Sequence, residues 1–162
     1  MQAIVPELRF AVFTDIDPIM SIFRLYPETK HKRRDFVSKM ITLGNVIFED
    51  EVVWILCKTK RRIKWGDTAE LCSGDVADHG IASANPGNGA ASRIASILFN
   101  KLDELRLSFW VSMRVSNTRC ISFMSNHNAV FAGNINWNHG QICGQVMCRR
   151  PASCEVVSQT VT

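Results

Sequence analysis

The stretch ASANPGNGAASRIASILFNKLDEL, from Ala82 to Leu105, contains the end of a strand, a turn of small residues and a helix. Apolar residues recur at helical spacing after the turn and give the helix one apolar face: Ile94, Ile97, Leu98, Leu102 and Leu105. Small residues ahead of a helix allow its first backbone N–H groups to approach an anion such as a phosphate. The stretch therefore predicts a phosphate-binding turn or a tight connection.

The composition is typical of one compact domain. The 162 residues are 46% hydrophobic and 21% charged, which suits a single core. The beginning, MQAIVPELRF, has no basic segment followed by an apolar one, and no apolar run approaches the roughly 20 residues of a membrane span. We therefore expect a cytoplasmic protein with no membrane partner. We expect one domain over residues 1–151 and a Ser/Thr-rich tail over 152–162.

The cysteines predict neither a disulfide framework nor a metal site. Six are present, an even number, but a chain without secretion signals and with an adequate core favours reduced thiols. No CxxC pair occurs. Four potential zinc ligands lie near the C-terminus: His139, Cys143, Cys148 and Cys154. Their unequal spacing matches no zinc-binding pattern.

Two short basic clusters account for much of the formal net charge of +4, at residues 30–34 (KHKRR) and 58–64 (KTKRRIK). Such clusters attract phosphates of a cofactor or of nucleic acid. Because only Trp65 offers an adjacent aromatic ring for stacking, we interpret both as solvated surface and regard a nucleic-acid partner as the weaker reading. Nucleic-acid binding would weaken steeply with salt.

Hydrophobic periodicity predicts the remaining elements. In the first half we expect a strand at 8–13, helices at 16–23 and 34–43, a hairpin of 46–49 and 52–58, a poorly patterned loop from 65 and a strand around 79–84. In the second half we expect a strand over 109–115, a helix at 118–126 and a hairpin of 129–135 and 141–148 across Asn138, His139 and Gly140.

This order of elements resembles the GCN5-related N-acetyltransferase (GNAT) family over nearly the entire chain. The resemblance implies an α/β (α+β) fold with a mixed, mostly antiparallel sheet of six or seven strands flanked by helices. The family's turn has the form P-x-x-(R/Q)-G-x-G-x-(G/A), and Pro86 aligns with its proline. Gly89 stands at the Arg/Gln position, Ala90 and Ser92 at the glycines, and Ile94 at the last small position, where a β-branched side chain is expected to narrow the groove.

In that family the turn holds the pyrophosphate of acetyl-CoA, so the resemblance implies this cofactor. Arg93 is then expected to replace the charge of the missing Arg/Gln from a neighbouring position. The cofactor-binding residues implied by the resemblance are Ser83, Ala84, Gly89, Ala90, Ala91, Ser92, Arg93 and Asn117.

A second segment, NTRCISFMSNHNAVF, is similar to the family's N-x-x-A-x-x-F-Y-x-x-x-G-F. Asn117, Cys120 and Phe123 fall on its asparagine, alanine and first aromatic residue. Asn117 also suits a helix N-cap, which is compatible with a cofactor contact. Met124 replaces the tyrosine that serves the family as general acid, and the only tyrosine in the chain is Tyr26.

The resemblance implies transfer of an acetyl group to an amine on a small molecule or a protein, which requires a base. His79 and Asp78 precede the turn, where the family often places its base, and are the predicted catalytic residues. A surface Asp and His at a strand start is the alternative reading.

The C-terminal part also looks like GNAT-like proteins of tailed bacteriophages, including an internal virion protein of short-tailed phages. The residues that carry this likeness are Asn117, Thr118, Ile121, Phe123, Ala129, Val130 and Phe131. It implies an alternative function: a catalytically silent structural or accessory protein, located in the host cytoplasm or the virion and contacting phage structural proteins.

Overall fold

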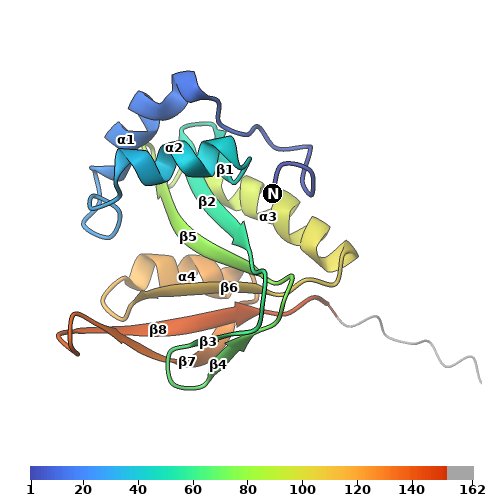
Figure 1. Ribbon diagram of the computed structural model, residues 1–162, viewed down its shortest axis with the longest axis vertical. Coiled ribbons are helices and arrows are strands. Elements are labelled where there is room, and N and C mark those ends of the chain that lie inside the picture. The colour runs from blue at the N-terminus through green and yellow to red at the C-terminus, as the bar shows by residue number, and fades with distance from the viewer. Residues whose placement is uncertain (153–162) are drawn as a thin grey trace, which may run out of the picture.

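The computed structural model describes residues 1–152, which form a mixed six-stranded sheet with helices on both faces (Figure 1). The strand order is β1-β2-β5-β6-β8-β7, and only the β5–β6 pair is parallel. The predicted fold class is confirmed. The helices are η1 (Phe13–Asp15, a 3-10 turn), α1 (Ile16–Phe23), α2 (Arg34–Thr42), α3 (Ala90–Glu104) and α4 (Thr118–Asn126). The strands are β1 (Val46–Glu49), β2 (Val52–Lys58), β3 (Ile63–Trp65), β4 (Ala69–Leu71), β5 (Val76–Ser83), β6 (Phe109–Arg114), β7 (Val130–Trp137) and β8 (Ile142–Arg149).

The core has two main layers because strand side chains alternate between the faces of the sheet. On β2, Trp54 packs with α3 and α4 on one face, whereas Val53 and Ile55 pack with α1 and α2 on the other. The Trp54 indole makes edge contacts with Phe99 and Phe109 at ring-centroid distances of 6.1 and 5.7 Å. This buried aromatic cluster joins α3 to the middle of the sheet.

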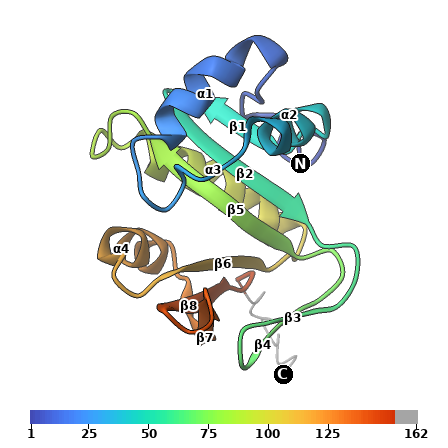
Figure 2. The same cartoon turned by 60° about the vertical axis from the view of Figure 1, so that its left-hand side comes forward.

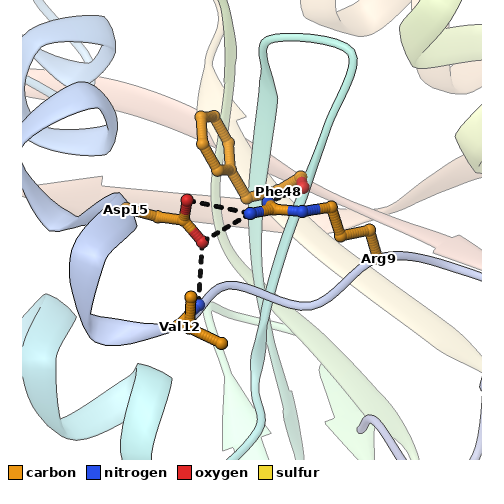
Figure 3. A network of polar contacts seen from close by, with 4 residues as sticks. All are labelled: Arg9, Val12, Asp15 and Phe48. Atoms are coloured by element: carbon orange, nitrogen blue, oxygen red, sulfur yellow. Dashed lines mark hydrogen bonds and ion pairs between the residues drawn. The ribbon is translucent and has the colours of Figure 1, made fainter.

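The strand expected at residues 8–13 is not formed. Only Phe10 makes a bridge, to Ile47, before the chain enters η1. Arg9 stabilises this turn (Figure 3): its guanidinium donates to the carbonyl oxygen of Phe48 at 2.6 Å and to both carboxylate oxygens of Asp15 at 2.9 Å. Asp15 also accepts from the N–H of Val12 at 2.8 Å. The chain therefore turns away from β1 where an extended strand would continue.

The loop expected from residue 65 contains a small hairpin, β3–β4, and β5 starts earlier than expected, at Val76. The hairpin turn is held against β7. The N–H of Asp67 donates to the carbonyl of Asn134 at 2.9 Å, and the hydroxyl of Thr68 donates to that of Ala132 at 2.8 Å. The other predicted helices and strands are present, with ends within about two residues of the predicted ones.

The sheet opens between its two parallel strands, β5 and β6. They pair only at Val76 with Phe109 and Ala77 with Trp110, and then diverge toward α4 (Figure 2). Just beyond this point β5 bulges: Leu56 of β2 lies opposite Asp78 and Ile55 lies opposite Gly80, so His79 has no partner on β2. The divergence leaves space between the strands for a ligand.

No helix in residues 1–152 is long and apolar enough to span a membrane. The predicted Ser/Thr-rich tail lies, from residue 153 onward, outside the described residues.

Candidate functional site

Two neighbouring cavities lie where β5 and β6 diverge. The turn cavity, of about 470 Å³, is lined by the turn before α3, by the end of β5 and by α4. The bulge cavity, of about 500 Å³, is lined by the bulge of β5, the end of β6 and the connection between α1 and α2. Five residues line both: Glu28, Thr29, Ile81, Asn117 and Cys120. A ligand in one cavity can therefore meet a ligand in the other.

The turn before α3 presents an open backbone to the turn cavity. Gly87 and Gly89 have φ angles of +91° and +84°, and a Cβ at either would meet no atom within 4 Å. The side chain of Asn88 accepts from the N–H of Ala90 at 3.0 Å. The N–H groups of Ala91 and Ser92 have no hydrogen-bond partner within residues 1–152, and the first turn of α3 carries no acidic residue. These features suit an anion.

Five of the eight predicted cofactor-binding residues line the turn cavity: Ser83, Gly89, Ala91, Ser92 and Asn117. The other three do not. Ala90 packs into the core, and Ala84 donates its N–H to the carbonyl of Glu51 at 3.0 Å. Arg93 turns away to pair with Asp50 at 2.7 Å and Glu49 at 3.4 Å, so its charge is compensated outside the cavity.

Ile94 does not narrow the groove, and that expectation is wrong. It is fully buried against the sheet, on the same helix face as Leu98. Met124, at the position of the family's tyrosine, is likewise fully buried in the core and lines neither cavity. Phe123 is the neighbouring residue that lines the turn cavity.

Asn117 caps α4, as predicted, and also lines both cavities. Its side-chain oxygen accepts from the N–H of Cys120 at 3.1 Å and so caps α4, and the residue lies at the junction of the cavities. Burial raises the pKa of the Cys120 thiol to about 12. At neutral pH the junction therefore holds a protonated thiol.

Asp78 and His79 both line the bulge cavity. The Asp78 carboxylate accepts from the indole N–H of Trp54 at 2.7 Å, and burial raises its pKa to about 6. His79 is exposed overall, but partial burial of its imidazole lowers its pKa, and the neighbouring Lys32 ammonium lowers it further. At pH 7 His79 is thus mainly a neutral imidazole, which can accept a proton.

Sequence reasoning missed two residues of the connection between α1 and α2. Tyr26 lines the turn cavity, and its hydroxyl donates to the carbonyl of Ser83. Lys32 lines the bulge cavity, with its ammonium 5.9 and 5.7 Å from the ring centroids of Phe23 and Phe36. It is half-buried, so the interpretation of residues 30–34 as solvated surface is wrong at this position. No local pattern indicates that this connection packs against β5.

No group of three His, Cys, Asp or Glu side chains in residues 1–152 could hold a metal ion. Cys154, one of the residues considered for zinc, lies outside that range.

Solved acetyltransferase structures share this overall fold. A GNAT-family acetyltransferase from Streptococcus agalactiae matches with a TM-score of 0.62 at 14% identity, covering 90% of this chain and 95% of that chain. The chain has the GNAT fold. Ard1 from Thermoplasma volcanium shares this fold with a TM-score of 0.70 at 12% identity, over 90% of this chain and 97% of that chain.

NAA60 from Arabidopsis thaliana, solved with a bisubstrate analogue, has the same GNAT fold. It matches with a TM-score of 0.66 at 9% identity, over 91% of this chain and 98% of that chain. No protein-family model and no curated protein sequence matches the chain. At these identities, the structural likeness concerns the fold.

Proposed function

We propose that the protein is a GNAT-type acetyltransferase that transfers the acetyl group of acetyl-CoA to an amine. The observation that carries the proposal is the junction of the two cavities between β5 and β6. One cavity offers backbone donors for an anion, and the other offers a neutral imidazole for a proton.

The residues of the turn cavity fit acetyl-CoA. The free N–H groups of Ala91 and Ser92 suit its pyrophosphate, and Gly87 and Gly89 let the phosphates approach the backbone. Beyond the point where β5 leaves β6, the strand has an unpaired edge to which the extended arm of the cofactor can bind. When bound, acetyl-CoA supplies an activated thioester at the junction.

The bulge cavity fits the acceptor amine, which reaches the protein as an ammonium ion. His79 takes one proton, directly or through a water molecule, and frees the nitrogen lone pair. The nitrogen then bonds to the acetyl carbon while the carbon–sulfur bond breaks, and the electron pair leaves on the CoA sulfur. The nitrogen gives up its second proton, which goes to the CoA thiolate directly or through water, so that the products are the neutral amide and the CoA thiol. The catalysis rests on positioning the two reactants and on removing this proton.

A transfer assay tests the proposal. The purified protein is incubated with acetyl-CoA and panels of primary amines and peptides, and both free CoA thiol and acetylated product are measured. We expect product formation that falls by about 10²- to 10⁴-fold in a His79→Ala variant, as for loss of a general base. Binding of acetyl-CoA without any turnover would contradict the catalytic part of the proposed function.

A catalytically silent accessory protein, including a component of a phage particle, is the second candidate. Two observations favour it: Met124 is buried where the family has its tyrosine acid, and the hydroxyl of Tyr26 is already bonded to Ser83. In this case residues 1–151 would form one domain that binds partner proteins through its surface. Cofactor binding without turnover, together with copurification in phage particles, would support this candidate.

A further inference from the structure

One arginine of the bulge cavity lacks a counterion. Arg114, the last residue of β6, is half-buried and makes no ion pair or side-chain hydrogen bond with another residue of the described range. The other arginines without a recorded ion pair in residues 1–152 are exposed: Arg24, Arg61, Arg106, Arg119 and Arg150. Because a partly desolvated guanidinium is costly without an anion, its position favours an anionic ligand group.

Two indoles form the walls beside Arg114. On β8, Gly144 lies directly opposite Arg114, and a Cβ there would lie 2.2 Å from the ring of Trp137. The Trp137 ring therefore lies over Gly144, on the face of the sheet where Arg114 projects. Trp65 lines the same cavity from the β3–β4 hairpin. A cavity lined by such rings excludes water, which strengthens the attraction of a guanidinium for an anion.

The position of Arg114 along the sheet sets a length for the ligand. Counted from the last pair, Ala77 with Trp110, His79 lies two residues along β5 and Ser112 two residues along β6. Arg114 lies two residues farther on, or about 7 Å along the strand. The divergence of the strands adds to this distance. An anion held by Arg114 is thus several bonds away from an amine that loses its proton to His79.

Two other charged residues of the bulge cavity, Lys32 and Glu28, bear on where an amine and an anion would bind. Lys32 lies over Phe23 and Phe36 and interacts with the Asp78 carboxylate. Glu28 lines both cavities and so lies at the junction where the amine would react. Glu28 suits an ammonium group at the junction, and Arg114 suits an anion at the far end of the cavity.

We infer that the acceptor is a primary amine that carries a carboxylate several bonds away, and that Arg114 binds this carboxylate and so determines specificity. The inference rests on the proposed function. The same chemistry occurs in a free long-chain amino acid and in a short peptide with a free N-terminus and a free carboxylate. Trp65 and Trp137 then contact the chain between the two charged groups.

Binding measurements with matched acid and amide probes test this inference. The probes are 6-aminohexanoate and 6-aminohexanamide for the free amino acid, and triglycine and triglycinamide for the peptide. Dissociation constants are measured by NMR titration, with and without saturating CoA. We expect each favoured acid to bind about tenfold or more tightly than its amide, as for a hydrogen-bonded ion pair. Which pair shows the preference distinguishes the two sources.

Three variants complete the experiment. Arg114→Gln is expected to bring the acid-to-amide ratio close to one, and Arg114→Lys to retain part of the preference. Arg106→Gln removes the same charge from an exposed position in the connection between α3 and β6 and is expected to change nothing. Equal binding of acid and amide by the wild-type protein, or a preference that survives in Arg114→Gln, would overturn the inference. If the wild-type protein does not bind CoA but still prefers the acid over the amide, only the cofactor part of the proposed function would be overturned.

Discussion

The indole N–H of Trp54 donates to Oδ1 of Asp78 at 2.7 Å, from the middle of the buried aromatic cluster to the edge of the bulge cavity. This bond stabilises the carboxylate form, whereas burial favours the protonated form and is the larger effect. A hydrogen bond from the backbone of Gly80 and the Lys32 ammonium also favour the carboxylate, and the pKa of Asp78 is about 6.

A Trp54→Phe substitution is expected to raise the pKa of Asp78 above about 6, because it removes the hydrogen bond and leaves the burial. A ¹³C NMR titration of the carboxyl carbon measures this pKa. Trp110→Phe is the matched control, since the indole of Trp110 donates to Asp75 at 2.9 Å. An unchanged or lower Asp78 pKa in Trp54→Phe would contradict this account of the bond.

Replacing Asp78 with Asn is expected to stabilise the fold at alkaline pH. The pKa of Asp78 is about 6 in the folded protein against an ordinary value of 3.8. Between these values the folded state holds more protons than the unfolded state, so stability falls as pH rises. The Asp78→Asn variant has no carboxyl group to ionise at this position. Its free energy of unfolding should therefore exceed that of the wild-type protein by on the order of 1–3 kcal/mol at pH 8 but by little at pH 4. Urea denaturation at both pH values measures the difference, and equal gains would refute the explanation.

The pH dependence of acetyl transfer is expected to report on the bulge cavity. Because burial lowers the pKa of His79 below 6.5, the rate should fall on the acid side only below that pH. His79→Ala should reduce kcat/KM across the neutral range and leave the Kd of CoA unchanged. His139→Asn, an exposed turn position with a φ of +55°, is the control. Loss of CoA binding in His79→Ala would indicate a structural role.

Gly144→Ala is expected to displace the Trp137 ring, since the added Cβ would lie 2.2 Å from it. We expect a loss of about 1–3 kcal/mol in the free energy of unfolding, typical of overpacking, and weaker binding of acceptor amines. The double variant Gly144→Ala/Trp137→Ala should recover part of the stability, because the ring is gone. Additive losses in the double variant would show that the two residues do not interact.

Local patterns in the sequence predicted most of the sheet. Residues 46–58 and 130–149 each hold two apolar-rich runs on either side of a turn, and the turns contain residues that adopt positive φ, such as Asp50, Asn138 and Gly140. The β3–β4 hairpin was missed because its strands are short and are held by tertiary contacts. A Cβ at Gly66 would lie 2.2 Å from the carbonyl oxygen of Asn134 on β7, so the fit depends on a segment far along the chain.

Only the part of the candidate site that is continuous in the sequence could be predicted. The turn before α3 is continuous in sequence, and its small residues do line a cavity. The expectation that Ile94 narrows the groove could have been corrected from the helical period, because Ile94 shares a buried helix face with Leu98. Tyr26, Lys32 and Arg114 come from separate segments that meet only through folding, and no spacing between them indicates a common site.

A calorimetric titration with acetyl-CoA tests the central claim most directly, that the turn before α3 binds this cofactor. The account predicts saturable binding to the wild-type protein with a Kd in the micromolar range, about −8 kcal/mol. Ser92→Glu, whose carboxylate would repel the pyrophosphate, should weaken binding at least about tenfold. Ser96→Glu, one turn farther along α3 and outside both cavities, should bind normally. Absence of binding to the wild-type protein at millimolar acetyl-CoA, or equal binding by both variants, would contradict the claim.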